Sequence, residues 1–226
     1  MGNIKILWIL LLSQCTLSHA QTLYFNRPAD TPQARYVIEL LSLAYKDIGH
    51  KLELIDFDRQ SALIAANEGE LDGQLGRIAG VTDSYANLLY VDFPLYSFNL
   101  QLISHCTTCS FNQIESMVVQ SGYLVVYQYM MEQSYKGELI EVKSSAAQLN
   151  LLMQKKVQGA LIVDFHLREH LPYMDIDTLK IDDLMTIDSF HYLHQKHKAL
   201  IPKLKNTLEK LEKKGVIEVL KAKYRI

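Results

Sequence analysis

The sequence predicts an α/β protein of two lobes, each built on a parallel sheet that helices cover. Strand-like and helix-like segments alternate as β-α-β-α-β through residues 22–78, and a similar alternation runs through 117–163. The two stretches also align at a constant shift, which places Leu54 on Ile140 and Gly73 on Gly159. Such alternation favours parallel strands joined by helices.

In the first half, the helix has the clearest boundaries. Thr31 is a suitable N-cap, Pro32 fits the first helical position, and apolar residues recur at helical spacing up to Ile48 before Gly49 ends the pattern. The elements expected here are a strand at 22–25, a turn at 26–30, this helix, a strand at 51–56, a short helix at 60–68 and a strand at 71–78.

The second half repeats this order. The elements expected are a strand at 117–120, a helix from about 123, a strand at 138–142, a helix over 145–155 and a strand at 160–163. Ser145 and Gln148 have the spacing of a capping box at the start of the second helix. Beyond them, an apolar stripe from Leu200 to Leu211 predicts a C-terminal helix that ends at Gly215, followed by a final apolar turn.

The composition excludes two classes of protein. The chain has 226 residues, 49% of them hydrophobic, and a formal net charge of −2. A disordered chain combines low hydrophobicity with high net charge, and a nucleic-acid-binding protein usually has a basic excess. We therefore expect a folded protein with no nucleic acid among its partners.

Residues 1–20 have the three regions of a secretory signal peptide. Lys5 precedes the apolar run Ile6–Leu12, and Ser18 and Ala20 are small residues at positions −3 and −1 of a cleavage site. The run is much shorter than the roughly 20 residues that span a membrane, which disfavours an uncleaved anchor. We expect cleavage after Ala20 and a periplasmic protein.

Cys106 and Cys109 form a C-x-x-C pair. In an oxidising compartment the simplest interpretation is a local structural disulfide. A redox-active pair is the alternative, because C-x-x-C motifs can lower the pKa of a thiol. Zinc would need two further ligands, and the sequence contains no second C-x-x-C motif.

Three segments resemble one protein family. Gly69–Gly73 is similar to the motif G-x-x-D-A/G before a strand, Val91–Tyr96 is similar to the F-S-x-P-Y that precedes the first interlobe crossing, and Phe190–His197 resembles the returning strand. Together, in this order, they resemble periplasmic solute-binding proteins of family 3, which serve amino-acid ABC transporters. The resemblance extends over essentially the whole chain after the signal peptide.

This resemblance implies a type II periplasmic-binding-protein-like fold with a hinge. Lobe 1 would comprise residues 21–100 and 190–226, and lobe 2 would comprise 101–189. The ligand would lie between the lobes, beyond the carboxyl ends of the strands, and closure of the hinge would bury it.

Several residues are candidates for binding the ligand. Arg27 and Arg77 follow or end strands of lobe 1, and a guanidinium can bind a carboxylate through two parallel hydrogen bonds. In lobe 2, a strand-to-helix junction could bind an anion through backbone N–H groups, and the acid at the end of the last strand could bind an ammonium group or cap the following helix. The remaining candidates are Tyr96, Ser121, Gly122, Tyr123 and Asp164.

The chain departs from the family at one important place. Amino-acid-binding members have the motif T-x-x-R, whose arginine binds the α-carboxylate, whereas this chain has Thr82-Asp83-Ser84-Tyr85. An amino-acid ligand is therefore not assured. His191, His194 and His197 could suggest a metal site, but their spacing does not bring them onto one face, and we expect no metal and no cofactor.

We therefore expect a non-enzymatic solute-binding protein that delivers a small polar solute, amino-acid-like or another small acid, to an ABC-type permease. One alternative is a ligand-sensing partner of a membrane signalling receptor, which the missing arginine favours. The other is a dehydratase-like enzyme on the same scaffold, with His166, Glu169 and His170 as the nearby titratable residues.

Overall fold

The computed structural model describes residues 21–57, 61–80 and 84–226. The expected signal peptide, Thr82 and Asp83 lie outside these residues. Among the described residues, no helix is both long and apolar enough to cross a membrane.

The described strands are β1 (Thr22–Asn26), β2 (Lys51–Ile55), β3 (Gly73–Ile78), β4 (Leu88–Ser104), β5 (Ser116–Gln120), β6 (Glu138–Val142), β7 (Gly159–Val163) and β8 (Lys180–His194). The α-helices are α1 (Pro32–Asp47), α2 (Ala62–Glu68), α3 (Leu124–Glu132), α4 (Ser145–Met153), α5 (Asp164–His170), α6 (Ile201–Lys213) and α7 (Val216–Tyr224). Short 3₁₀ helices lie at 111–113, 171–173 and 195–200.

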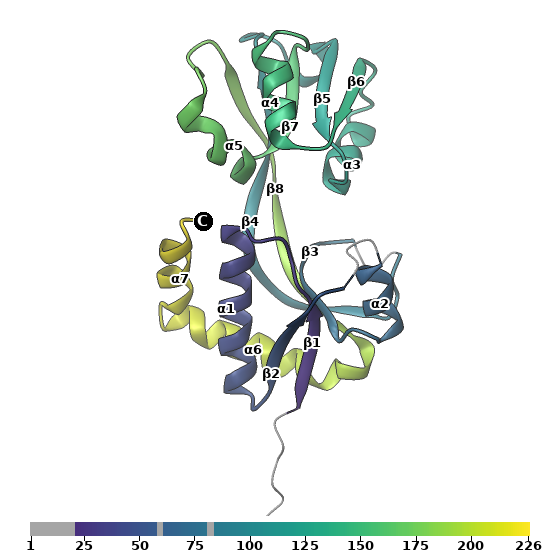
Figure 1. Cartoon of the computed structure of the whole chain (residues 1–226), viewed down its shortest axis with the longest axis vertical. Helices are drawn as coiled ribbons and strands as arrows, with labels where there is room; N and C mark the ends of the chain where they lie inside the picture. The colour runs from purple at the N-terminus through teal and green to yellow at the C-terminus, as the bar shows by residue number, and fades with distance from the viewer. Residues whose placement is uncertain (1–20, 58–60, 81–83) are drawn as a thin grey trace, which may run out of the picture.

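Two lobes are joined by the long strands β4 and β8, which run through both (Figure 1). The sheet order is β2-β1-β3-β8-β4-β7-β5-β6. Strand β1 is parallel to β2 and β3, and β5 is parallel to β6 and β7, as the alternating pattern predicted. Strand β8 is antiparallel to both β3 and β4, so the complete sheet is mixed. The predicted two-lobed α/β fold class is confirmed.

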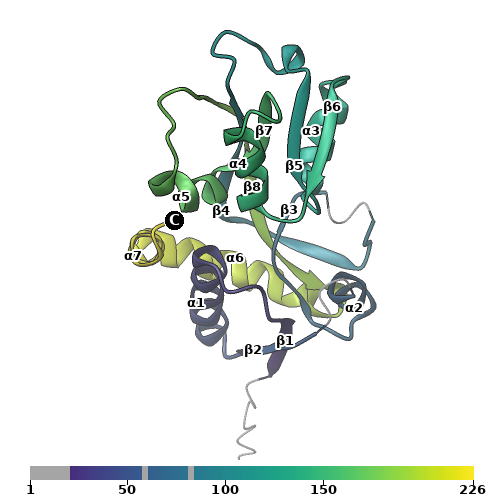
Figure 2. The same ribbon diagram turned by 45° about the horizontal axis from the view of Figure 1, so that its top comes forward.

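Each lobe has its own apolar core. The core of lobe 1 lies between the sheet and helices α1, α6 and α7, which pack together beside it (Figure 2). Leu40, Leu204 and Leu208, from opposite ends of the chain, are fully buried there. In lobe 2, separate buried clusters lie around Met117 and Leu152.

Asp72 lies directly before β3 and stabilises this part of lobe 1 through three polar contacts. Its carboxylate accepts hydrogen bonds from the backbone N–H of Tyr24 (2.7 Å) and from His197 Nε2 (2.6 Å), and it pairs with Lys196 Nζ (2.8 Å). Burial opposes ionisation of this carboxyl, but the three donors hold its pKa below the ordinary value. The next residue, Gly73, has no room for a side chain, because a Cβ atom there would lie 2.0 Å from the carbonyl oxygen of Tyr192.

Three details differ from the sequence prediction. The N-cap of α4 is Ser144, whose side chain accepts from the N–H of Ala147, so the capping box predicted at Ser145 is wrong. Gln148 is instead buried and donates to the carbonyls of Val118 and Leu161. The expected final apolar turn is the nine-residue helix α7.

The expected disulfide between Cys106 and Cys109 is present, with Cα atoms 5.4 Å apart. It closes the loop that follows β4 in lobe 2, and both cysteines pack against the apolar cluster around Met117, which includes Phe111.

Candidate functional site

A cavity of about 340 Å³ lies between the lobes. This volume is at the lower end of the range for small-molecule pockets. Lobe 1 contributes the end of β1 and the loop after it, the first turns of α1, most of β3 and one residue of β4. Lobe 2 contributes the end of β5 and the starts of α3 and α5. The lining residues are Asn26, Arg27, Pro28, Ala29, Thr31, Gln33, Ala34, Val37, Gln74, Leu75, Gly76, Arg77, Tyr96, Gln120, Tyr123, Phe165 and His166.

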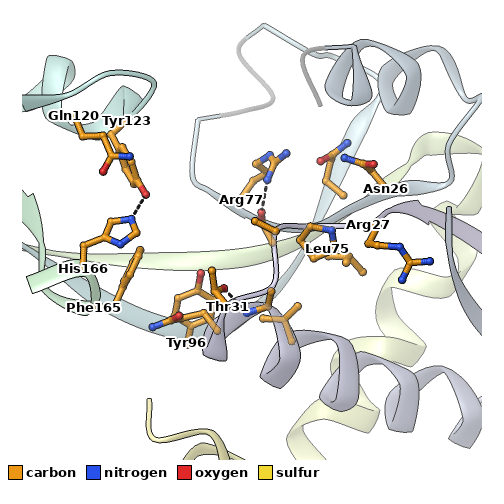
Figure 3. Close-up of a pocket in the computed structure, with 17 residues that line it drawn as sticks. Asn26, Arg27, Thr31, Leu75, Arg77, Tyr96, Gln120, Tyr123, Phe165 and His166 are labelled. Atoms are coloured by element: carbon orange, nitrogen blue, oxygen red, sulfur yellow. Dashed lines mark hydrogen bonds between the residues drawn. The ribbon is translucent and has the colours of Figure 1, made fainter. Parts of the chain in front are cut away.

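Arg27 and Arg77 line the cavity from lobe 1, where Arg27 follows β1 and Arg77 lies on the neighbouring strand β3. Figure 3 shows both residues across from Tyr123 and His166, with the guanidinium of Arg27 directed away from these two side chains. The guanidinium of Arg27 pairs with Asp56 at 2.7 Å and donates to the carbonyl of Leu54 at 3.2 Å. Arg77 donates from Nη1 to the carbonyl of Gly76 at 3.1 Å.

The first turn of α1 borders the same wall. Thr31 is the N-cap, as predicted, and its hydroxyl oxygen accepts from the N–H of Ala34 at 3.1 Å. Gln33, two positions later, is almost completely buried at 9% exposure. Gln33 was not predicted from the sequence, although its polar side chain on the apolar face of a helix was a usable signal.

Tyr96 lies where β4 passes between the lobes. Burial raises the pKa of its phenol, while a hydrogen bond with Ser189 and the positive charge of Arg77 act in the opposite direction. Its ring packs edge-on against Tyr36 and lies near Phe98, with centroids 6.4 and 6.1 Å away. Tyr96 therefore contributes both to the cavity and to the packing of the hinge.

The wall from lobe 2 contains a chain of three hydrogen-bonding side chains. The phenol of Tyr123 contacts Nε2 of His166, and Nδ1 of His166 lies 3.4 Å from a carboxylate oxygen of Glu169. The ring of Phe165 packs on His166 with centroids 4.7 Å apart. Tyr123 was a predicted candidate, whereas Phe165 was missed.

Three other candidates lie outside the lining. The N–H of Ser121 donates to the carbonyl of Val142 at 2.9 Å, and both Ser121 and Gly122 are exposed. Asp164 is the first residue of α5, not its N-cap, and accepts from Nη1 of Arg168 at 2.8 Å. Four of the seven predicted ligand-binding residues, Arg27, Arg77, Tyr96 and Tyr123, therefore lie together, and the other three do not join them.

The three histidines near the C-terminal end of β8 have separate partners. His191 contacts the hydroxyl of Tyr45 at 2.7 Å, His194 accepts from the N–H of Lys196 at 3.2 Å, and His197 contacts Asp72. Within the residues that the structure describes, no group of three or more potential metal ligands gathers.

By sequence, the chain matches no protein-family model and no curated protein. By structure, it resembles an ancestral amino-acid-binding protein described as a precursor of cyclohexadienyl dehydratase, at 15% identity and a TM-score of 0.69, over 90% of this chain and 94% of that one. It also resembles the substrate-binding protein of an amino-acid ABC transporter, at 16% identity and a TM-score of 0.63, over 90% and 98% of the two chains.

A third similar structure is the ligand-binding core of the GluR0 receptor from Nostoc punctiforme in complex with L-glutamate. It is 15% identical, has a TM-score of 0.66 and is matched over 90% of this chain and 98% of that one. The expected resemblance to amino-acid-type solute-binding proteins is thus confirmed for the fold, since these identities are too low to carry a ligand from one protein to another.

Proposed function

We propose that this protein is a periplasmic solute-binding protein that captures a small, carboxylate-bearing solute between its lobes and presents it to an ABC-type permease. The observation that carries the proposal is the interlobe cavity, with Arg27 and Arg77 on one wall and Tyr123 and His166 on the other. A guanidinium is well suited to bind a carboxylate, and aromatic walls suit a compact ligand.

Hinge closure on the ligand would create the closed conformation that the permease recognises. Among the described strands, β4 and β8 alone run through both lobes (Figure 1), so a rotation about them would bring the lobe 2 wall toward the arginines. The signal peptide predicted from residues 1–20 supports export to the periplasm, and the ABC-transporter protein among the similar structures supports the choice of partner. A signalling receptor is the alternative partner, which the similar receptor core supports.

Replacement of Arg77 by methionine tests the proposed carboxylate site. A charge-assisted hydrogen bond contributes about 1.5–3 kcal/mol, so Arg77→Met should weaken binding of a carboxylate ligand at least tenfold in isothermal titration calorimetry. The ligand would first be found by thermal-shift screening of residues 21–226 against amino acids, other small carboxylic acids and polyamines.

Arg225→Met is the matched control, because Arg225 is exposed at the C-terminal end of α7. This substitution changes the net charge by the same amount as Arg77→Met. The control should bind like the unmodified protein. Failure of every tested compound to stabilise the protein, together with no decrease of the radius of gyration in small-angle scattering, would contradict the proposed function.

An enzymatic role on the same scaffold is the second candidate. The hydrogen-bonded chain of Tyr123, His166 and Glu169 on the cavity wall favours it, because such a chain can transfer a proton to or from a bound acid. His170 contacts the hydroxyl of Ser145 at 3.1 Å and is not among the lining residues, so the proposed acid or base is His166. Turnover of a cyclic acid that His166→Gln abolishes would support this role, and binding without turnover would exclude it.

A further inference from the structure

The described lining of the cavity carries positive charge and contains no carboxylate. Its ionisable residues that can be cationic are Arg27, Arg77 and His166, and no aspartate or glutamate is among the lining residues. An α-amino acid brings an ammonium group together with its carboxylate. Enclosing that ammonium without an anionic partner, close to guanidinium groups, is unfavourable because the charge loses its hydration and is repelled.

Three described carboxylates close in sequence to the lining residues have partners within the protein. Asp56 pairs with Arg27 at 2.7 Å and is 86% exposed at its side chain, and Asp164 pairs with Arg168 at 2.8 Å. Glu169 lies behind His166, 3.4 Å from the ring nitrogen that does not contact Tyr123. None of the three lines the cavity.

Two residues of the lining instead have neutral hydrogen-bond acceptors without a partner. The amide oxygens of Gln33 and Gln120 are buried and have no hydrogen-bond partner among the described residues. The two residues come from opposite lobes. The amide nitrogen of Gln120 donates to the carbonyl of Lys143 at 3.3 Å, which identifies its oxygen as the unsatisfied atom.

An unsatisfied buried acceptor is costly, so these oxygens are positions at which a ligand donor would be favoured. A hydroxyl group donates one hydrogen bond and carries no charge. It therefore satisfies an amide oxygen without placing a cation beside Arg77.

We infer that the cavity selects carboxylic acids that carry a neutral hydroxyl group in place of the α-ammonium group. Their carboxylate binds on the lobe 1 wall beside Arg27 and Arg77. Their hydroxyl donates to the amide oxygen of Gln33 or Gln120. This inference rests on the proposed function and specifies its ligand class.

Matched sets of ligands test the inference directly. Each set contains an α-amino acid with its 2-hydroxy and 2-oxo analogues: phenylalanine with phenyllactate and phenylpyruvate, glutamate with 2-hydroxyglutarate and 2-oxoglutarate, and alanine with lactate and pyruvate. Calorimetric titration of residues 21–226 should give at least tenfold tighter binding of the hydroxy acid than of the amino acid in the set that fits.

Equal or tighter binding of the amino acid would overturn the inference and leave the proposed function standing. Absence of binding by every carboxylate would overturn both. The two failures are therefore distinguishable.

Gln120→Glu provides a second test, because it adds the missing carboxylate at the lobe 2 wall. The ratio of hydroxy-acid to amino-acid affinity should fall at least tenfold. Gln133→Glu is the control: it lies at the C-terminal end of α3 in the same lobe, is exposed, and adds the same charge away from the lining. An unchanged ratio in a folded Gln120→Glu protein would also count against the inference.

Discussion

His191 is a fully buried histidine on β8, between the sheet and α1. Its ring contacts the hydroxyl of Tyr45 and packs against Phe25 and Tyr45, with centroids 5.4 and 5.7 Å away. Burial lowers its pKa from the ordinary value of 6.5 to about 4, while hydrogen bonds to backbone groups act in the opposite direction.

This shift makes the stability of the protein depend on pH. The unfolded chain takes up a proton near pH 6.5, whereas the folded protein keeps His191 neutral until about pH 4. The stabilisation that comes from keeping His191 neutral is therefore fully present above pH 6.5. As the pH falls toward 4, this stabilisation is lost, and the free energy of unfolding decreases by about 3 kcal/mol over the whole window.

We predict that His191→Gln makes this dependence shallower. Between pH 7 and 4.5, the free energy of unfolding of the variant, from urea titration followed by circular dichroism, should fall by about 2 kcal/mol less than that of the unmodified protein. His170→Gln, a substitution in lobe 2, should keep the original dependence. An identical pH dependence in the His191 variant would show that another group is responsible.

Single residues of the site were only partly predictable from the sequence. Arg27 and Arg77 were found because charged residues at strand ends are readily recognised. Asp164 was chosen for the same reason, but it pairs with Arg168 one helical turn later, and its role in binding stays a prediction. Gln33 was missed although it lies four residues before Val37, on the buried face of α1.

The strands β4 and β8 form the hinge, and aromatic rings line it. Their pairing shifts register near Pro94 and between Leu100 and Gln101, which are the local irregularities along the crossing. On β4, Phe98 packs edge-on against Phe165 of α5 with centroids 5.5 Å apart, and it is 8% exposed. A lobe 2 residue of the cavity is thus positioned by a residue of the hinge.

Phe98→Ala should therefore affect both stability and binding. Loss of a buried phenylalanine costs about 3 kcal/mol, and the position of Phe165 at the cavity wall would no longer be fixed. We expect a lower urea midpoint and weaker binding in calorimetry. Tyr173→Ala, at a side chain that is 87% exposed, is the control and should change neither. Normal stability in Phe98→Ala would show that this packing is unimportant.

Elements were predicted well where their pattern is local. Helix α1 has a cap, a proline and an apolar stripe within one segment, so its start at Pro32 was found. The first half of β8, from Lys180, was missed because adjacent aspartates interrupt its alternation. Its pairing with β3 and β4 joins residues about a hundred positions apart, and no local pattern contains that information.

The division of the whole molecule is visible in its apolar clusters. The lobe 1 cluster combines Leu23 and Leu40 from the beginning of the described chain with Leu204 and Leu220 from its end. The buried residues named in the lobe 2 clusters lie between Phe98 and Ile187, and Ile78 and Tyr96 pack against them. The sequence repeat correctly predicted two comparable lobes, but the lobe boundaries at 100, 101, 189 and 190 stay a prediction.

The lobe 1 core is discontinuous in sequence, and this predicts an order in which the two lobes fold. A ribosome or a secretion channel releases β1 and α1 first, yet their core lacks Leu204, Leu208 and Leu220 until the last helix emerges. The core of lobe 2 is built from consecutive segments, so closing its loops costs less conformational entropy, and we expect lobe 2 to fold first.

Pulse-labelled hydrogen exchange during refolding should show protection of β5 and β7 before β1 and β2. The reverse order would contradict this prediction. Until lobe 1 is complete, the chain would have one wall of its ligand site but not the arginines opposite.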